Sequence, residues 1–136
     1  MNREESIKFL ALVKVAYPNS YKDMDNASKQ ATVNMWQISF PNTPFDVMSM
    51  AIDNFRRKST FPPTVAEIIE ELRKLNYKAV ADMITAKQRG DEEKYQKARY
   101  VRDVTSEFDK IETRISYGNL NTKMIDAYYK DQKLLT

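Results

Sequence analysis

Apolar residues recur every three or four positions along most of the chain, the spacing that gathers them on one face of an α-helix. Prolines interrupt this pattern in the first half, and each interruption predicts the end of a helix because proline cannot continue one. We therefore predict helices over about residues 4–17, 26–39 and 44–58, and a fourth that opens at residue 65. The helical pattern then continues to Gly90, a suitable residue just beyond a helix C-terminus.

Two capping patterns predict where the third and fourth helices begin. Thr64 is followed by Glu67, and Thr43 is followed by Pro44 and Asp46. In each case a threonine and an acid three residues later are placed to satisfy the first free N–H groups of a helix.

The second predicted helix carries an apolar stripe that suits packing against another helix. The stripe consists of Ala27, Ala31, Met35 and Ile38, with Trp36 at its edge. Its alanines would allow a close approach. Tryptophan can anchor a protein partner, but a single tryptophan in a small domain is more often a core residue, so we expect Trp36 in the core.

The third predicted helix ends in three consecutive cations, Arg56, Arg57 and Lys58. The negative end of the helix dipole favours cations there, and we prefer this structural explanation to a contact with phosphate or with an acidic partner. The helix–corner–helix that follows invites comparison with DNA-reading helix-turn-helix units. Its diproline corner is longer and stiffer than their usual turn, so direct sequence-specific DNA binding is not expected.

Beyond Gly90, Asp91 can cap a further helix, whose apolar positions are spaced three and four apart. These positions are Val101, Val104, Phe108, Ile111 and Ile115. A stripe of this kind has to be buried, either on the rest of the chain or on a partner. Gly118 is expected to end this helix, and a last helix capped by Asn121 is expected to bear Met124, Tyr128 and Tyr129.

These elements predict an all-α protein in two parts. Residues 1–78 would form a compact N-terminal domain of about four helices, and residues 79–136 a helical C-terminal arm that is the candidate partner-binding region. The composition agrees, because 42% of the 136 residues are hydrophobic and only two are glycine.

Charge and composition exclude several classes of function. The net charge of +3 is spread evenly: residues 1–78 hold eleven Lys/Arg and nine Asp/Glu, and residues 79–136 hold eleven and ten. Neither part is therefore a polybasic arm for DNA. Without cysteine or histidine, the chain cannot form disulfides, Cys/His zinc sites, thiol nucleophiles or imidazole bases. The two glycines form no phosphate-binding loop. We expect no enzyme activity, and no catalytic, cofactor-binding or metal-ligating residues.

The sequence also bears on location. Lys14 interrupts the apolar run near the N-terminus, which makes a signal peptide improbable, and no stretch approaches the roughly 20 apolar residues of a membrane span. The absence of cysteine fits a reducing compartment. We expect a cytoplasmic protein of a bacterial host cell, without membrane contact.

The order of features over residues 2–75 resembles the phage helicase loader/inhibitor family. The features are a first helix ending in Ala16-Tyr17-Pro18, a helix with Trp36, a short proline link, a helix with Ala51 and Phe55, and the run Phe61-Pro62-Pro63-Thr64-Val65-Ala66-Glu67-Ile68. The resemblance implies a helical N-terminal domain and a C-terminal segment that engages a hexameric, DnaB-type replicative helicase. It further implies an ATP-dependent complex in which the helicase is restrained and then handed to a phage origin-binding initiator.

A protein without a nucleotide site can act on an ATPase only by binding its conformations with different affinities, and apolar helix faces can supply that binding. The candidate partner-binding residues are Val101, Val104, Phe108, Ile111 and Ile115, followed by Met124, Tyr128 and Tyr129. The alternative is that the first stripe packs onto residues 1–78 as ordinary core. Two other functions stay open: a small helical DNA-binding phage regulator, and a self-associating helical structural protein.

Overall fold

The computed structural model describes residues 1–116, and side chains as far as Asp109. Within this range the chain forms five helices and no strands, which confirms the all-α fold class. The helices are α1 (Arg3–Ala16), α2 (Asn26–Ser39), α3 (Phe45–Arg56), α4 (Val65–Arg89) and α5 (Glu92–Ser116). No helix in the described residues is long and apolar enough to cross a membrane.

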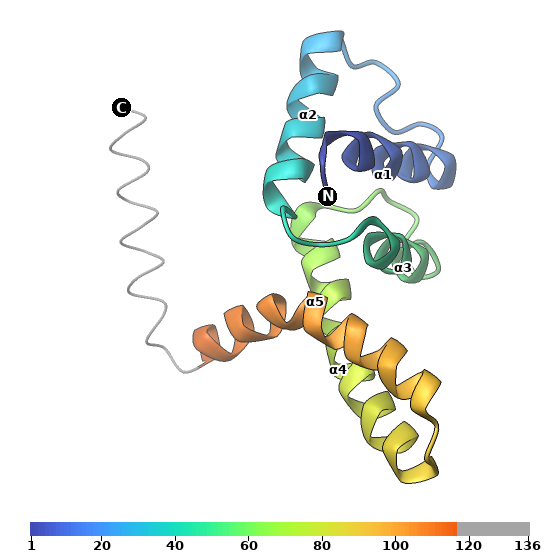
Figure 1. The fold of residues 1–136 in the computed structure, drawn as a ribbon. Coiled ribbons are helices and arrows are strands. Elements are labelled where there is room, and N and C mark those ends of the chain that lie inside the picture. The colour runs from blue at the N-terminus through green and yellow to red at the C-terminus, as the bar shows by residue number, and fades with distance from the viewer. Residues whose placement is uncertain (117–136) are drawn as a thin grey trace.

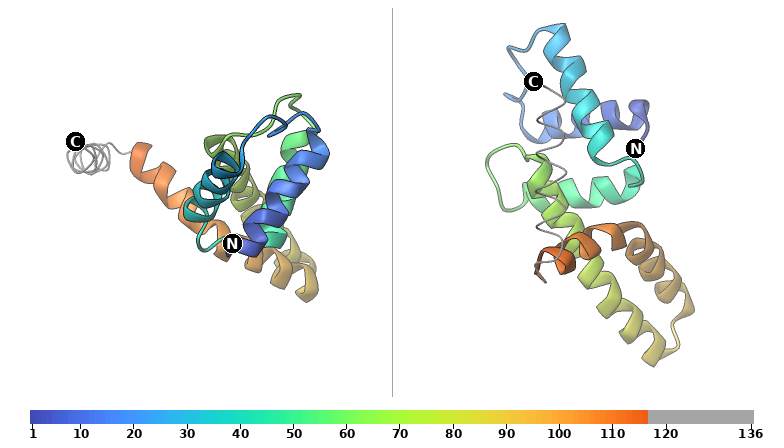
Figure 2. Two further views of the ribbon diagram at one scale, coloured as in Figure 1. Left: turned by 90° about the horizontal axis from the view of Figure 1, so that it is seen from above. Right: turned by 90° about the vertical axis from the view of Figure 1, so that its left-hand side faces the viewer.

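The first three helices gather around the beginning of α4, as Figure 1 shows. The second half of α4 and the first half of α5 run side by side as a hairpin that projects away from this cluster, as Figure 1 and the right-hand view of Figure 2 show. α4 continues without a break through residues 78 and 79, where the sequence suggested a boundary between domain and arm.

Aromatic rings form the centre of the core. Trp36 is 1% exposed, and its ring lies 5.0 Å from the ring of Phe9 and 5.7 Å from the ring of Phe40. On the far side of Phe40 lies Phe108 of α5, with the ring centroids 6.1 Å apart. The expectation that Trp36 is a core residue is confirmed.

Most of the predicted helix ends are confirmed. The side chain of Asp25 caps α2, accepting a hydrogen bond from the N–H of Ser28. Thr64 and Glu67 form a complete capping box at the start of α4. At its other end Gly90 adopts the left-handed conformation, with φ +69°, and Asp91 accepts a hydrogen bond from the N–H of Lys94 in α5. Gly118 and Asn121 lie outside the described residues.

The capping pattern predicted at Thr43 is wrong. Pro44 occupies the N-cap position of α3 without a side-chain hydrogen bond, and Thr43 is buried beneath it at 1% exposure. Asp46 does not reach back to the cap but accepts a hydrogen bond from the hydroxyl of Tyr100 in α5, at 3.0 Å. The same carboxylate oxygen also accepts a hydrogen bond from the N–H of Val47 at 2.9 Å, so Asp46 serves the first turn of α3 and a tertiary contact together, without the predicted bond to Thr43.

The apolar stripe predicted on α2 faces solvent. All four of its members are exposed, Met35 to 49% and Ile38 to 77%. The buried face of α2 consists instead of Val33 and Trp36, and continues to Phe40 just beyond the helix. The prediction was wrong because the helix carries two apolar stripes, and the one with the larger aromatic side chains is buried.

Candidate partner-binding surfaces

The predicted stripe on α5 is divided between the core and the region whose side chains are not described. Phe108 is 4% exposed and belongs to the core, while Val101 and Val104 are half-buried and pack against it. The backbone of Ile111 and Ile115 continues α5. Their side chains lie outside the described part of the chain, as do Met124, Tyr128 and Tyr129. The structure therefore brings the first three stripe residues onto the N-terminal cluster.

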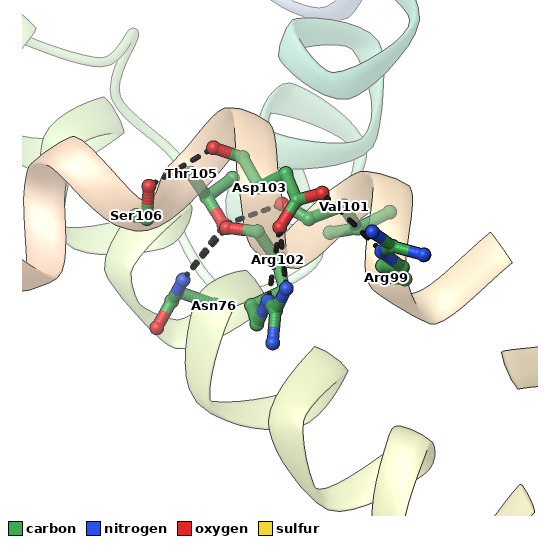
Figure 3. A network of polar contacts seen from close by, with 7 residues as sticks. All are labelled: Asn76, Arg99, Val101, Arg102, Asp103, Thr105 and Ser106. Carbon is green, nitrogen blue, oxygen red and sulfur yellow. Dashed lines mark hydrogen bonds and ion pairs between the residues drawn. The ribbon is translucent and has the colours of Figure 1, made fainter. Parts of the chain in front are cut away.

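A buried polar pair fixes α5 against α4 (Figure 3). The side-chain amide of Asn76 donates to the carbonyl oxygen of Arg102 at 3.1 Å and to the hydroxyl oxygen of Thr105 at 3.2 Å. The Thr105 hydroxyl in turn donates to the carbonyl oxygen of Val101 at 2.6 Å. Asn76 and Thr105 are 4% and 0% exposed, so a slip of α5 along α4 would leave buried polar groups unpaired.

A second polar contact ties α5 to α3. Tyr100 donates its hydrogen bond to Asp46 from the exposed side of the helix pair. Partial burial, and then the hydrogen bond and charge of Asp46, raise the pKa of Tyr100. The phenol is therefore held in its protonated, donating form. Together with Phe108 and the Asn76–Thr105 pair, this contact makes the first part of α5 an integral part of the folded cluster.

The basic run after α3 is engaged within the chain. Arg56 and Arg57 both pair with Asp53, at 2.7 and 2.9 Å, and Lys58 pairs with Glu71 of α4, whose side chain is 4% exposed. The hydrogen bond from Arg56 lowers the pKa of Asp53, and the one to Glu71 raises the pKa of Lys58. All three cations thus have intramolecular partners, which favours a structural role over phosphate binding.

Exposed apolar side chains lie on all five helices and in the corner before α4. Beside the α2 stripe of Ala27, Ala31, Met35 and Ile38, they are Ile7, Leu12 and Val15 on α1, Met50 on α3, the corner residue Phe61 at 76% exposure, Tyr77, Val80 and Ile84 on α4, and Tyr100 on α5. The sequence predicts that the α2 stripe packs against another helix, and it assigns the other exposed side chains no binding role. Side-chain size is the signal that distinguishes the buried face of α2 from the α2 stripe, because Val33, Trp36 and Phe40 offer more apolar area to bury.

An open groove runs along the seam of α4 and α5 in the projecting hairpin, with a volume of about 460 Å³. Its floor is apolar, and cationic side chains stand along its edges. No group of three acidic side chains that could hold a metal ion occurs in the part of the chain that is described. The arrangement is suited to binding a macromolecular segment, and these surfaces are the candidate functional sites.

Comparison with protein families agrees with this arrangement. A family profile for the N-terminal domain of a phage helicase loader/inhibitor matches residues 1–69, which cover α1 to α3 and the opening of α4. Searches of curated proteins and of solved structures found no significant match. Because the profile covers half of the 136 residues, the chain belongs to the phage helicase loader/inhibitor family.

Proposed function

We propose that the chain is a non-enzymatic adaptor of phage DNA replication that binds a DnaB-type hexameric replicative helicase. In this role it restrains the helicase and assists its delivery to the replication origin, in the cytoplasm of the bacterial host. The observation that carries the proposal is the family match over residues 1–69. The fold is consistent with it, because the described surface offers apolar helix faces for binding.

Binding alone is sufficient for such a role. A ligand shifts a helicase between conformations when it binds one of them more tightly, and a difference of about 1.4 kcal/mol changes the population ratio about tenfold. A complex that forms with ATP and weakens without it would be the direct expression of this coupling. The origin-binding initiator would then release the helicase by competing for the adaptor or for the same conformation.

We place the helicase contact on the apolar positions of α5 and of the segment after it. The burial of Phe108 means that this residue contributes through folding, whereas Val101 and Val104 stay partly accessible. The direct contacts would then come from Ile111, Ile115, Met124, Tyr128 and Tyr129. Helix-in-groove binding uses side chains at such spacing as anchors.

The test is complex formation between the purified chain and the replicative helicase of the host or phage, followed by analytical ultracentrifugation with ATP, with ADP and without nucleotide. We expect a complex that is tightest with ATP. The double variant Tyr128→Ala/Tyr129→Ala should weaken it, while the matched control Phe61→Ala, an exposed aromatic in the corner before α4, should not. Absence of a complex in all three conditions would refute the proposal.

A further inference from the structure

The groove between α4 and α5 lies where the third helix of a three-helix bundle would pack. α4 contributes side chains at three- and four-residue spacing from Leu75 to Arg89, and Met50 of α3 also lines the groove. At 1.5 Å per residue this stretch of α4 is roughly 21 Å long, or about four helical turns. The groove is open to solvent, so a helix can reach it from outside.

The floor of the groove is apolar and made of small side chains. Ala79 and Ala86 of α4 face Ala98 of α5, and all three are less than 9% exposed. Small residues permit close approach of a third helix. A helix that packs onto two antiparallel neighbours in this way completes a three-helix bundle.

The edges of the groove carry an excess of positive charge. Lys78, Arg89, Lys94 and Lys97 line it against two acids, Asp82 and Asp91. Among residues 1–109, only Lys97 of these four cations has a carboxylate within 4 Å, that of Glu93 at 3.2 Å. The Asp91 carboxylate is already used as a helix cap. Unlike Arg56, Arg57 and Lys58, most of these cations are therefore available to an incoming anion.

We propose that this groove docks an acidic amphipathic helix of a partner protein, with its apolar stripe on the alanine floor and its carboxylates beside the lysines. The chain's own residues 117–136 are a poorer match, because they contain three lysines and two aspartates. A second copy, with net charge +3, is also unfavourable. Nucleic acid is disfavoured because a phosphate backbone has no apolar stripe to cover the alanine floor of the groove.

The test selects binding peptides from a library, and no helicase is present in the experiment. A displayed library of helices about four turns long, with a fixed apolar stripe and flanks varied among Glu, Gln and Lys, is panned against the full 136-residue chain. The selected peptides should carry Glu flanks. Their affinity should fall about tenfold or more in Lys78→Glu/Lys94→Glu, and this loss should shrink at high salt. The same reversal at Lys22 and Lys29, which lie outside the groove, is the control.

A second pair of variants tests the site and guards against misfolding. Thr85→Trp fills the groove, whereas Ile84→Trp adds the same side chain at the adjacent exposed position outside it. Binding should be lost in the first variant and kept in the second, with circular dichroism unchanged in both. Three results would overturn the proposal. They are enrichment of Gln or Lys flanks, an equal loss of peptide binding in both members of either pair of variants, and binding of a single-stranded or duplex oligonucleotide in the groove. Because no helicase is present, these outcomes are independent of the proposed function.

Discussion

Phe108 of α5 lies against Phe40, the residue that follows α2, with ring centroids 6.1 Å apart. The family match ends at residue 69, so a side chain far beyond the matched region completes the core of the matched domain. Phe108 is 4% exposed there, beside the Phe9–Trp36–Phe40 rings. The N-terminal cluster and the beginning of α5 should therefore unfold together as one cooperative unit.

Replacing Phe108 with alanine should lower the free energy of unfolding by about 3 kcal/mol, because it removes a buried ring and leaves a cavity next to Phe40. Urea denaturation followed by tryptophan fluorescence measures this, since Trp36 reports on the same cluster. The control Ile84→Ala removes a half-exposed side chain and should cost less than about 1 kcal/mol. An unchanged midpoint for Phe108→Ala would show that α5 folds independently of the N-terminal cluster.

Lys58 pairs with Glu71, the one ion-paired carboxylate in the described residues that is almost wholly buried. Lys58→Met would leave Glu71 with only Lys74, whose Nζ lies 3.9 Å away. We expect the free energy of unfolding to fall by about 1–2 kcal/mol. This is less than the usual cost of breaking a buried ion pair, because Lys58 is itself half-exposed. Urea denaturation of single and double variants measures it.

Two comparisons make this result specific. Arg57→Met breaks an exposed pair with Asp53 and should change stability by less than about 0.5 kcal/mol. The double variant Lys58→Met/Glu71→Met should recover most of the loss, because it removes the unpaired buried charge. If Lys58→Met lowers the free energy of unfolding no more than Arg57→Met does, the Lys58–Glu71 pair does not stabilise the fold.

Alkaline pH should destabilise the fold through Tyr17. Its hydroxyl donates to the carbonyl oxygen of Ser59 at 2.9 Å, and burial raises its pKa above the ordinary value of 10.0. The folded state therefore binds the proton more tightly than the unfolded state does. The resulting stability is fully present below about pH 10 and is lost as pH rises through the folded pKa. The raised pKa of Tyr21 and of Lys58 acts in the same direction.

Thermal unfolding between about pH 8 and pH 11 checks this prediction, with the midpoint expected to fall above about pH 10. Tyr17→Phe removes the ionisable group and should make the decline shallower, although it also removes one hydrogen bond and so lowers the midpoint at every pH. An identical slope for parent and variant would mean that Tyr17 ionises equally easily in both states.

Local signals in the sequence predicted the helices well, because caps and prolines act within a few residues of where they stand. Thr64, Gly90 and Asp91 each perform the role that their neighbours predict. The pattern at Thr43 fails because Thr43 is buried, and the expected partner Asp46 accepts hydrogen bonds from the N–H of Val47 and the hydroxyl of Tyr100 instead. The Tyr100 contact joins residues more than fifty positions apart, and a pattern of neighbours carries no information about it.

The candidate sites depended even more on tertiary structure. Sequence periodicity identified the α5 stripe, but only packing shows that Phe108 enters the core while Val101 and Val104 stay half-buried. The groove between α4 and α5 is invisible in the sequence, because its lining comes from three helices. A stripe of apolar residues predicts that one face of a helix will be buried. The partner that buries this face depends on tertiary packing.

The α2 stripe gives the sharpest contrast between pattern and packing. Ile38→Gln should change stability by less than about 0.5 kcal/mol, because Ile38 is 77% exposed and glutamine suits a helix at least as well. Trp36→Ala, two residues earlier, should cost about 3–5 kcal/mol by emptying the centre of the core. Thermal denaturation followed by circular dichroism compares the two without relying on the tryptophan signal. If Ile38→Gln were as damaging as Trp36→Ala, α2 would have to be turned about its axis, with the stripe of Ala27, Ala31, Met35 and Ile38 facing inward.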